Sequence, residues 1–465
     1  MRVASVLKWS AFGAFIIAGA GIAFAYSQGQ FPGHPVDGSP IALVGGRLYD
    51  PANDSLIDPA TVIVRGTDIA AVGAAEPIPD DARVLYVNGL TLLPGFIDSH
   101  VHLSGIRPRI RDGSRELGWL RYLWRFIRRF PERRRTLIRH GVTTVKSLGD
   151  PHPWVVRFAG RIERHELAGP RVFAGGPVFT APGGYPVGRL RRAGQGDTSF
   201  IAQVTRQVIG PGEAATAVKR IASRVDFVSV ALERRGEPEL PRLSPSVLYA
   251  ICATASERGI PVLAHVSTLE DLALALAAGV NGIEHIPYDQ AIDSLTLVEL
   301  RERGIAVDPT LQAIERHLSE LVGDTASARR ARDNLRRLRL AGVPVVVGSD
   351  APSPGTTLGY TFHEELRNLV EVGYTPRQAI AAATTVAAEH LGVADRLGSI
   401  APGMLADIIA VAGDPVSDIR ATAAVYLVIA DGQILLDRLD EVRSPGRLVL
   451  AAEATKPRSR EGGLD

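Results

Sequence analysis

The chain has 465 residues, enough for two or three domains or for one large α/β barrel with a smaller companion. Hydrophobic residues make up 46% and charged residues 22%, which is ordinary for a soluble globular protein and excludes a disordered or low-complexity chain. The net charge of +2 implies no nucleic-acid partner, and the single Cys252 excludes both an internal disulfide and a zinc site built from cysteines. Histidine and carboxylate side chains would therefore have to hold any metal.

The first thirty residues predict a targeting segment. Arg2 and Lys8 precede an uncharged stretch over residues 9–26 that contains Ala23-Phe24-Ala25, the small-residue pattern that a signal peptidase reads. We therefore expect residues 1–30 to hold a signal peptide, the mature chain to begin at Tyr26, and the protein to be exported to the periplasm or the extracellular space. The alternative is an uncleaved segment that anchors the protein in a membrane, because residues 9–26 approach the length of a bilayer span.

Short β-branched runs separated by turn residues occur at both ends of the chain. Between residues 38 and 93 these runs alternate with Gly-Gly and Pro-Asp-Asp turns. Similar runs return between residues 398 and 450, where Asp431-Gly432 is typical of a hairpin. We expect the two ends of the chain to combine into one small β-sandwich domain.

Between residues 94 and 397, apolar strand-like runs alternate with helical stretches rich in Ala, Leu and Arg. This alternation is typical of βα units and predicts a (β/α)8 TIM barrel. The eight expected strands cover residues 95–100, 142–148, 171–174, 226–231, 261–266, 282–285, 305–309 and 343–349.

Two segments depart from the βα pattern. Residues 177–212 are rich in Gly, Pro and Arg, and we expect them to form a long loop over the barrel mouth. Residues 107–139 interleave arginines with aromatic side chains, which favours an amphipathic barrel helix with solvated arginines over a contact with a membrane surface.

Polar residues close several of the expected strands, and the reactive groups of a parallel barrel lie at these strand ends. His100 and His102 end the first strand, where alternation points both imidazoles to the same side. The fifth strand ends in His265, the sixth in His285 and the eighth in Asp350. A lone histidine at a strand end is more often structural than a ligand, but four histidines and an aspartate at one barrel mouth match the ligand types of a catalytic zinc.

The same residues carry a family resemblance. The motifs are Pro-Gly-Phe-Ile-Asp-Ser-His-Val-His at residues 94–102, Gly-Val-Thr-Thr-Val, Ala-His, Ile-Glu-His, Gly-Ser-Asp-Ala and the stretch at residues 398–407. Together they resemble the metal-dependent amidohydrolases, in particular the branch of imidazolonepropionase and the prolidase-like enzymes, over residues 40–440. The resemblance implies that His100, His102 and Asp350 bind one metal, and that His265 and His285 bind or adjoin a second position.

One departure from the family concerns the number of metals. Relatives with two metals commonly carry a carboxylated lysine at the end of the fourth strand, where this chain has Ser229, and serine cannot supply a bridging anion. We therefore expect one zinc ion, with His285 beside it; two metals, with Lys146 as a substitute bridge, remain the alternative. The expected ligands of the single ion are His100, His102, His265 and Asp350.

The resemblance also implies a mechanism for hydrolysis of a carbon–nitrogen bond. Asp350 would take a proton from a metal-activated water and pass it to the leaving nitrogen, while His285 polarises the carbonyl and stabilises the oxyanion. Relatives often have Gly-Gly-His after the third strand, where this chain has Tyr185, whose phenol can still donate a hydrogen bond to that oxyanion.

The expected substrate is a small molecule that contains an amide, a cyclic amide or a dipeptide bond, and we expect a homo-oligomer that binds no nucleic acid. Two alternatives stay open. One is a lactonase or other ester hydrolase that uses the same site, and the other is a metal-retaining pseudoenzyme with a binding role, which Ser229 and Tyr185 motivate. Five intact ligand-type residues argue against the pseudoenzyme, because buried unpaired histidines and an aspartate without metal would cost stability.

Overall fold

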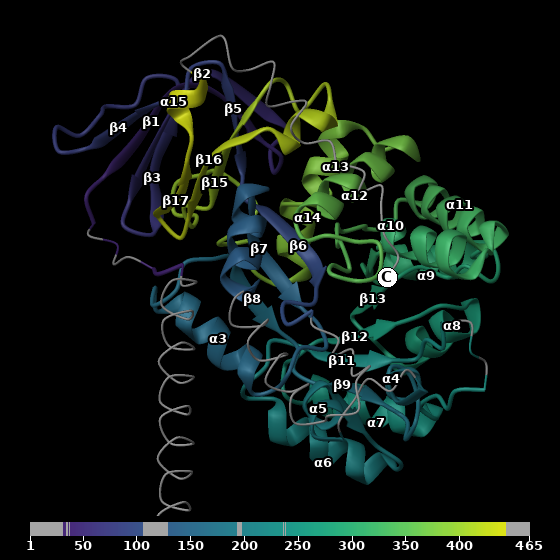
Figure 1. Ribbon diagram of the computed structural model, residues 1–465. Helices are drawn as coiled ribbons and strands as arrows, with labels where there is room; N and C mark the ends of the chain where they lie inside the picture. The colour runs from purple at the N-terminus through teal and green to yellow at the C-terminus, as the bar shows by residue number, and fades with distance from the viewer. Residues whose placement is uncertain are drawn as a thin grey trace, which may run out of the picture. The chain divides into compact units, whose positions relative to one another are not determined.

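The computed structural model describes residues 31–33, 36, 38–105, 129–192, 198–235, 237 and 239–442 (Figure 1). The predicted targeting segment and residues 106–128 of the arginine-rich stretch lie outside these ranges. Inside them, no helix combines the length and the apolar character that crossing a membrane would require.

The chain divides into two compact units. Unit 1 contains Ile97–Leu137 and Thr144–Tyr374, and unit 2 contains Val36–Phe96, Ile138–Thr143 and the chain from Thr375 onward. All the residues of the predicted metal site belong to unit 1.

Unit 1 holds strands in the chain order that a barrel requires. They form two sheets, ordered β6-β7-β8 and β10-β9-β11-β12-β13-β14, and β11 to β14 pair in parallel. Seven of the eight expected strands are present as β6 (Phe96–Val101), β7 (Val142–Ser147), β8 (Arg171–Ala174), β11 (Val228–Ala231), β12 (Val262–His265), β13 (Gly282–Glu284) and β14 (Ala306–Asp308).

The eighth expected strand, residues 343–349, is not a regular strand. It still joins β14 to β6 through two isolated parallel bridges, from Val307 to Val345 and from Val101 to Ala351. Close contacts with Asp308 of β14 and Asp98 of β6 explain this irregularity. Gly348 packs so near Asp308 that a Cβ would lie 2.0 Å from the Oδ2 atom of that carboxyl, and the carboxyl of Asp98 accepts from the backbone N–H and hydroxyl of Ser349 over 2.9 and 2.7 Å.

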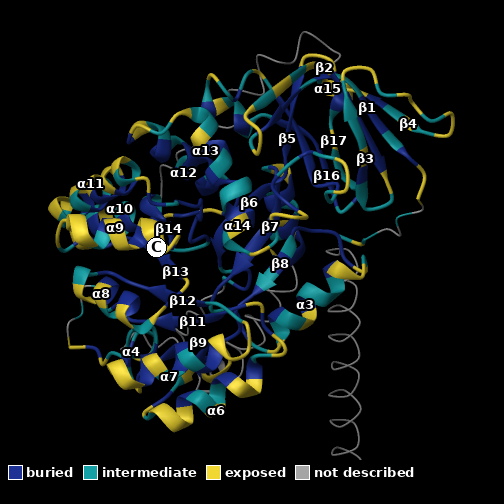
Figure 2. Ribbon diagram, turned by 180° about the vertical axis from the view of Figure 1, so that it is seen from behind, coloured by how far each residue is buried: buried dark blue, intermediate teal, exposed yellow. Residues whose placement is uncertain are grey.

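Helices cover the outside of these strands, with their exposed residues turned away from the buried strands (Figure 2). Four of them begin at a side chain that accepts a backbone N–H, namely Ser244, Thr268, Asp293 and Asp324. Besides α4 (Val187–Arg192) and α5 (Thr198–Val204), the described helices of unit 1 are α3 (Trp154–Glu163), α6 (Pro211–Ile221), α7 (Pro245–Ser256), α8 (Leu269–Ala278), α9 (Ser294–Glu302), α10 (Leu311–Arg316), η1 (His317–Val322), α11 (Thr325–Ala341) and α12 (Tyr360–Glu371).

The prediction of a long loop over residues 177–212 is wrong for most of that segment. Its described part contains β9 (Val178–Thr180), α4 (Val187–Arg192), α5 (Thr198–Val204) and β10 (Thr205–Gln207). β9 pairs in parallel with both β10 and β11, because Val178, Phe179 and Thr180 suit a buried strand and extend the sheet by two members.

The arginine-rich stretch also differs from its prediction at Arg134, which is buried rather than solvated. Its guanidinium donates to the carbonyl oxygen of Phe31 over 3.0 Å and to that of Ala168. The same group lies 5.5 Å from the ring centroid of Phe130. Carbonyl acceptors and an aromatic face together replace the water that this cation would otherwise need.

Unit 2 joins the two ends of the chain in one sheet, as predicted. The strand order is β17-β16-β15-β5-β1-β2-β3, with β4 paired to β1, and the antiparallel pair of β5 with β15 connects the N-terminal to the C-terminal strands. The strands are β1 (Ile41–Asp50), β2 (Ser55–Arg65), β3 (Asp68–Gly73), β4 (Arg83–Tyr86), β5 (Leu90–Pro94), β15 (Ile408–Ala412), β16 (Val425–Ala430) and β17 (Gln433–Asp437).

An apolar core formed by strands from both ends holds this sheet together. Leu43, Leu92, Ile408 and Leu427 are fully buried in one cluster. The hairpin predicted at Asp431-Gly432 connects β16 to β17, and both residues adopt positive φ, at 50° and 75°. The helices of this unit are α13 (Pro376–Ala382), α14 (Thr385–His390), η2 (Ile419–Ala423) and α15 (Leu439–Val442).

Candidate metal centre

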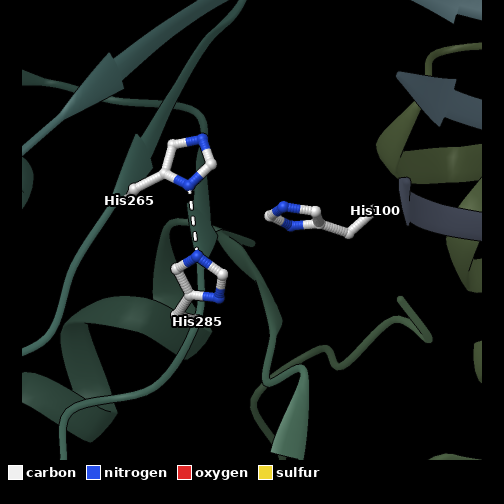
Figure 3. Close-up of side chains that lie close together, drawn as sticks. All are labelled: His100, His265 and His285. Atoms are coloured by element: carbon white, nitrogen blue, oxygen red, sulfur yellow. Dashed lines mark hydrogen bonds between the residues drawn. The ribbon is translucent and has the colours of Figure 1, made fainter. Parts of the chain in front are cut away.

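The predicted ligands meet at one end of the unit 1 strands. His100 lies in β6, His265 ends β12, and His285 directly follows β13. Their three rings face one shared space (Figure 3), where the ring centroid of His100 lies 5.3 Å from that of His265 and 4.9 Å from that of His285. Imidazoles from three separate βα units therefore reach one point.

The carboxyl of Asp350 completes this cluster. Its Oδ1 atom lies 2.9 Å from Nε2 of His102 and 3.8 Å from Nε2 of His100. The Nε2 atom of His100 is buried, and the described residues offer it no hydrogen-bond partner. An unpartnered imidazole nitrogen beside a carboxylate fits a bound cation, since buried polar atoms otherwise find partners.

Candidate ligand atoms fall into overlapping groups whose members all lie within 4.8 Å of one another. One group is His100, His265 and His285, and another is His100, His102 and Asp350. His100 belongs to both, so the five predicted ligands form one continuous site.

The second nitrogen of each ring is held by a separate partner. Nδ1 of His100 lies 2.7 Å from a carboxylate oxygen of Glu284, Nδ1 of His102 lies 2.6 Å from the carbonyl oxygen of Leu148, and Nδ1 of His285 lies 2.6 Å from the hydroxyl of Thr310. Such contacts fix the orientation of an imidazole and select the nitrogen that is left to bind a metal.

Lys146, the residue expected as a substitute bridge, takes part in this support. Its Nζ lies 2.5 Å from the carboxylate of Glu284, whose other oxygen contacts His100. Both side chains are fully buried. The sequence did not reveal this pair, since its members are 138 residues apart on different strands.

Burial keeps most of these imidazoles neutral, which is the form that binds a metal. Burial lowers the pKa of His265 to about 3. Burial, followed by the Arg235 guanidinium, lowers the pKa of His285 well below its usual value, and burial also lowers the pKa of His100 despite the carboxylate of Glu284. Their ring nitrogens are available as electron-pair donors at neutral pH.

His102 and Asp350 behave differently because they contact each other. Burial is the largest single effect and disfavours the charged form of both groups, but their mutual hydrogen bond and the neighbouring charges together outweigh it. The pKa of His102 is therefore raised, and the pKa of Asp350 lies well below its usual value. Asp350 is therefore ionised, as both a ligand and a proton acceptor must be.

Backbone strain concentrates at this site. His285, Thr310, Asp350 and Arg235 all adopt positive φ, between 41° and 69°, and so do only three other non-glycine residues of the described chain. Such conformations persist where the surrounding structure imposes them, which is common at functional sites.

The two departures from the family pattern both lie at the site. The hydroxyl of Ser229 lies 2.9 Å from Nε2 of His265, so this serine orients an imidazole at the position where a bridging lysine would stand. Tyr185 lines the cavity, where its ring centroid lies 5.8 Å from the guanidinium carbon of Arg235.

Two charged residues that sequence reasoning missed, Glu233 and Arg235, also belong to the site. Both line the cavity, and their side chains are only 2% and 10% exposed. They follow β11 in the run Leu-Glu-Arg-Arg, which looks like an ordinary solvated loop.

A cavity of about 170 Å³ opens above the ligands. Apolar side chains form part of its wall, and Arg189 adds a positive charge. The apolar residues include Val178, Leu190, Val204, Ala313, Pro352 and Pro354. Its size and lining suit a small organic molecule.

Comparison with known proteins identifies the relatives of this chain. The model of the amidohydrolase family matches residues 91–435. The sequence is 25% identical to ochratoxinase from Aspergillus niger over 438 residues, which cover 83% of this chain and 84% of that protein. It is 26% identical to imidazolonepropionase from Symbiobacterium thermophilum over 414 residues, which cover 80% of this chain and 88% of that protein.

Solved structures agree with the sequence comparison. The structure of an Xaa-Pro dipeptidase with methionine bound in its active site aligns with a TM-score of 0.73 and 25% identity, covering 85% of this chain and 99% of that one. The fold is therefore a (β/α)8 barrel with a small β-sandwich built from both chain ends, as predicted.

Fold and site together define a metal-dependent hydrolase that acts on small molecules. The chain belongs to the amidohydrolase family, and its enzyme class is hydrolysis of carbon–nitrogen bonds. The predictions of family, fold and enzyme class are thereby confirmed.

Proposed function

We propose that this enzyme uses a single zinc ion to hydrolyse an amide bond in a small molecule such as a dipeptide, a cyclic amide or an N-acylated amine. The observation that carries the proposal is the convergence of His100, His102, His265 and Asp350 on a cavity of about 170 Å³. The names of the relatives, among them an Xaa-Pro dipeptidase and an imidazolonepropionase, support bonds of this kind.

The residues fit a zinc ion well. Nitrogen and oxygen donors, neutral imidazoles and the unpartnered Nε2 atom of His100 are what zinc requires of a protein site. When bound, the metal lowers the pKa of a water molecule towards neutrality and polarises the carbonyl of the substrate. A single ion is favoured because Ser229 offers no bridging anion.

The side chains around the cavity perform the proton transfers. Asp350 is ionised and buried, so it accepts a proton from the attacking water and then donates it to the leaving nitrogen. Tyr185 faces the same cavity and donates to the developing oxyanion. His285 lies beside them, and its Nε2 atom accepts a hydrogen bond from Arg235, so the positive charge on this side of the cavity belongs to the guanidinium.

Metal removal tests the proposal directly. Dialysis against a chelator should abolish hydrolysis of a panel of dipeptides, cyclic amides and N-acyl amino acids, and added zinc should restore it. Lactones and simple esters, assayed in parallel, test the alternative activity. Cleavage of esters with no cleavage of any amide would replace the proposal by an ester hydrolase, and bound metal with no turnover of either class would indicate a pseudoenzyme.

We further propose that the protein is exported and that residues 1–30 contain a cleaved signal peptide. The pattern Ala23-Phe24-Ala25 after an uncharged stretch supports this. N-terminal sequencing of the protein from an exporting host should give Tyr26 as the first residue. A membrane-bound product that retains Met1 would instead support anchoring through residues 9–26. The homo-oligomer stays a prediction, for which the elution volume of the purified enzyme is the measurement.

A further inference from the structure

A guanidinium lies among the histidines of the metal centre. The Nη2 atom of Arg235 is 2.7 Å from Nε2 of His285 and 3.5 Å from Oδ2 of Asp350. The Arg235 side chain is only 10% exposed, and its backbone adopts a φ of +47°, so the chain turns this residue inwards at the end of β11.

The direction of the contact with His285 follows from chemistry. A guanidinium can only donate hydrogen bonds, so Nε2 of His285 must accept with its lone pair. The other nitrogen of the ring, Nδ1, contacts the hydroxyl of Thr310. The electron pair that His285 would offer to a metal is therefore already directed at Arg235.

Glu233 holds the guanidinium in this position. One of its carboxylate oxygens contacts Nε of Arg235. The other oxygen, Oε1, lies 3.7 Å from Nε2 of His285 and 3.9 Å from Nδ1 of His265. The carboxylate thus contacts the cation on one side and faces two imidazoles on the other.

The three atoms that face one another here are Oε1 of Glu233, Nδ1 of His265 and Nε2 of His285, and their spacing is that of metal ligands. Nδ1 of His265 and Nε2 of His285 lie 3.2 Å apart, and ligand atoms around a tetrahedral zinc ion are separated by about 3.3–3.4 Å. The ring of His265 is nearly equidistant from the other two, with its centroid 5.3 Å from that of His100 and 5.2 Å from that of His285. A second cation would fit next to the first, where Arg235 already supplies a positive charge.

We propose that the guanidinium of Arg235 takes the place of a second metal ion, which limits the enzyme to one metal per chain. This inference rests on the proposed function, since it assumes the first ion. Ser229 and Arg235 then have complementary roles: the chain lacks a bridging anion at Ser229 on β11, and it carries a fixed organic cation six residues later, at Arg235.

A permanent cation has a consequence for substrate recognition. Arg235 lines the cavity, so its guanidinium can stabilise a negative charge that develops on a substrate bound there. Unlike a metal ion, the guanidinium cannot be removed by a chelator and does not depend on pH, because arginine stays charged in proteins.

Metal counting on the intact protein tests the proposal. Wild type loaded with Zn²⁺ and then desalted should contain one equivalent per chain, and Mn²⁺-loaded protein should give the six-line electron paramagnetic resonance spectrum of isolated ions. The Arg235→Ala variant should bind a second equivalent, since Oε1 of Glu233 and Nε2 of His285, which lie 3.7 Å apart, then face each other without a cation. Added guanidinium chloride should compete with that second equivalent, whereas sodium chloride at the same ionic strength should not.

Control variants separate this effect from a general loss of structure. Arg234→Ala removes a neighbouring arginine whose guanidinium pairs with Glu270 over 3.6 Å, and it should keep one equivalent. Arg235→Gln keeps much of the side-chain volume without the charge. If Arg235→Ala does not fold, the number of metal equivalents bound by Arg235→Gln decides the test. Two equivalents of metal per wild-type chain, or an exchange-coupled Mn²⁺ spectrum of the wild type, would overturn the proposal. A folded Arg235→Ala or Arg235→Gln variant that still binds only one equivalent would overturn it as well. Because these readouts do not require turnover, they are independent of the substrate panel that tests the proposed function.

Discussion

Asp350→Asn is expected to lower kcat for the preferred amide substrate by about 10²–10⁴-fold, because an amide cannot accept the proton of the attacking water. Asparagine keeps the size of the side chain and one carbonyl oxygen. That oxygen can still accept from the hydroxyl of Ser353, now 3.1 Å away. We therefore expect the variant to fold, with a circular dichroism spectrum and a melting temperature close to those of the parent.

The measurement needs a metal count beside the kinetics, because Asp350 is also an expected ligand. Zinc-saturated variant and parent should be compared at equal metal content. Asp333→Asn, the same substitution on the exposed face of α11, is the matched control and should leave kcat unchanged. Undiminished hydrolysis by a zinc-loaded Asp350→Asn variant would rule out this residue as the proton acceptor.

The convergence of the four histidines and Asp350 could be predicted from sequence because the barrel rule is local. Each ligand closes a short apolar run, and the strand ends of a parallel barrel converge at one mouth. His265 and His285 could thus be assigned from the few residues around them, without any knowledge of which strands are neighbours. Composition and turn residues identified the sheet of unit 2 in the same way, including the hairpin at Asp431-Gly432.

The eighth strand shows where local reasoning stops. Residues 343–349 have the apolar, β-branched character of a strand, but Asp98 of β6 takes the backbone N–H of Ser349 that a regular ladder would use. The sequence around Ser349 does not indicate that its hydrogen-bond partner, Asp98, lies 251 residues away. The segment still lies between β14 and β6 in the barrel, but it lacks the regular backbone hydrogen bonds of a strand.

Charged residues of the site were missed for a related reason. Glu233 and Arg235 stand in a run of charges that usually means a solvated loop, and their burial depends on a turn with positive φ at Arg235. Glu284 precedes His285, and its buried partner Lys146 is brought to it only by the folded barrel. Long-range pairing of charges is a property of the closed barrel and cannot be inferred from spacing along one strand.

That buried pair should be the most sensitive structural feature of the site. Lys146→Met leaves the carboxylate of Glu284 without its cation in a fully buried position, where it also faces the neighbouring carboxyl of Asp308. Removing one partner of a buried ion pair typically costs about 3–5 kcal/mol. We therefore expect the free energy of unfolding, measured with urea on the metal-loaded protein, to fall by about that amount.

The same variant should weaken metal binding, because Glu284 contacts Nδ1 of His100 and its own position depends on Lys146. Loss of such supporting contacts typically lowers metal affinity by about 10–100-fold. A competition titration with a chromophoric zinc chelator measures this loss. Lys219→Met, on the exposed face of α6, makes the same exchange of side chains and should change neither quantity.

A double variant separates charge from packing. Lys146→Met combined with Glu284→Gln leaves no unpaired charge, so most of the lost stability should return, since neutral replacements of buried ion pairs are often tolerated. Metal affinity should recover less, because the amide oxygen of glutamine polarises Nδ1 of His100 more weakly than a carboxylate does. If Lys146→Met alone unfolds at the same urea concentration as the parent, the pair contributes nothing to stability and His100 must be oriented by packing instead.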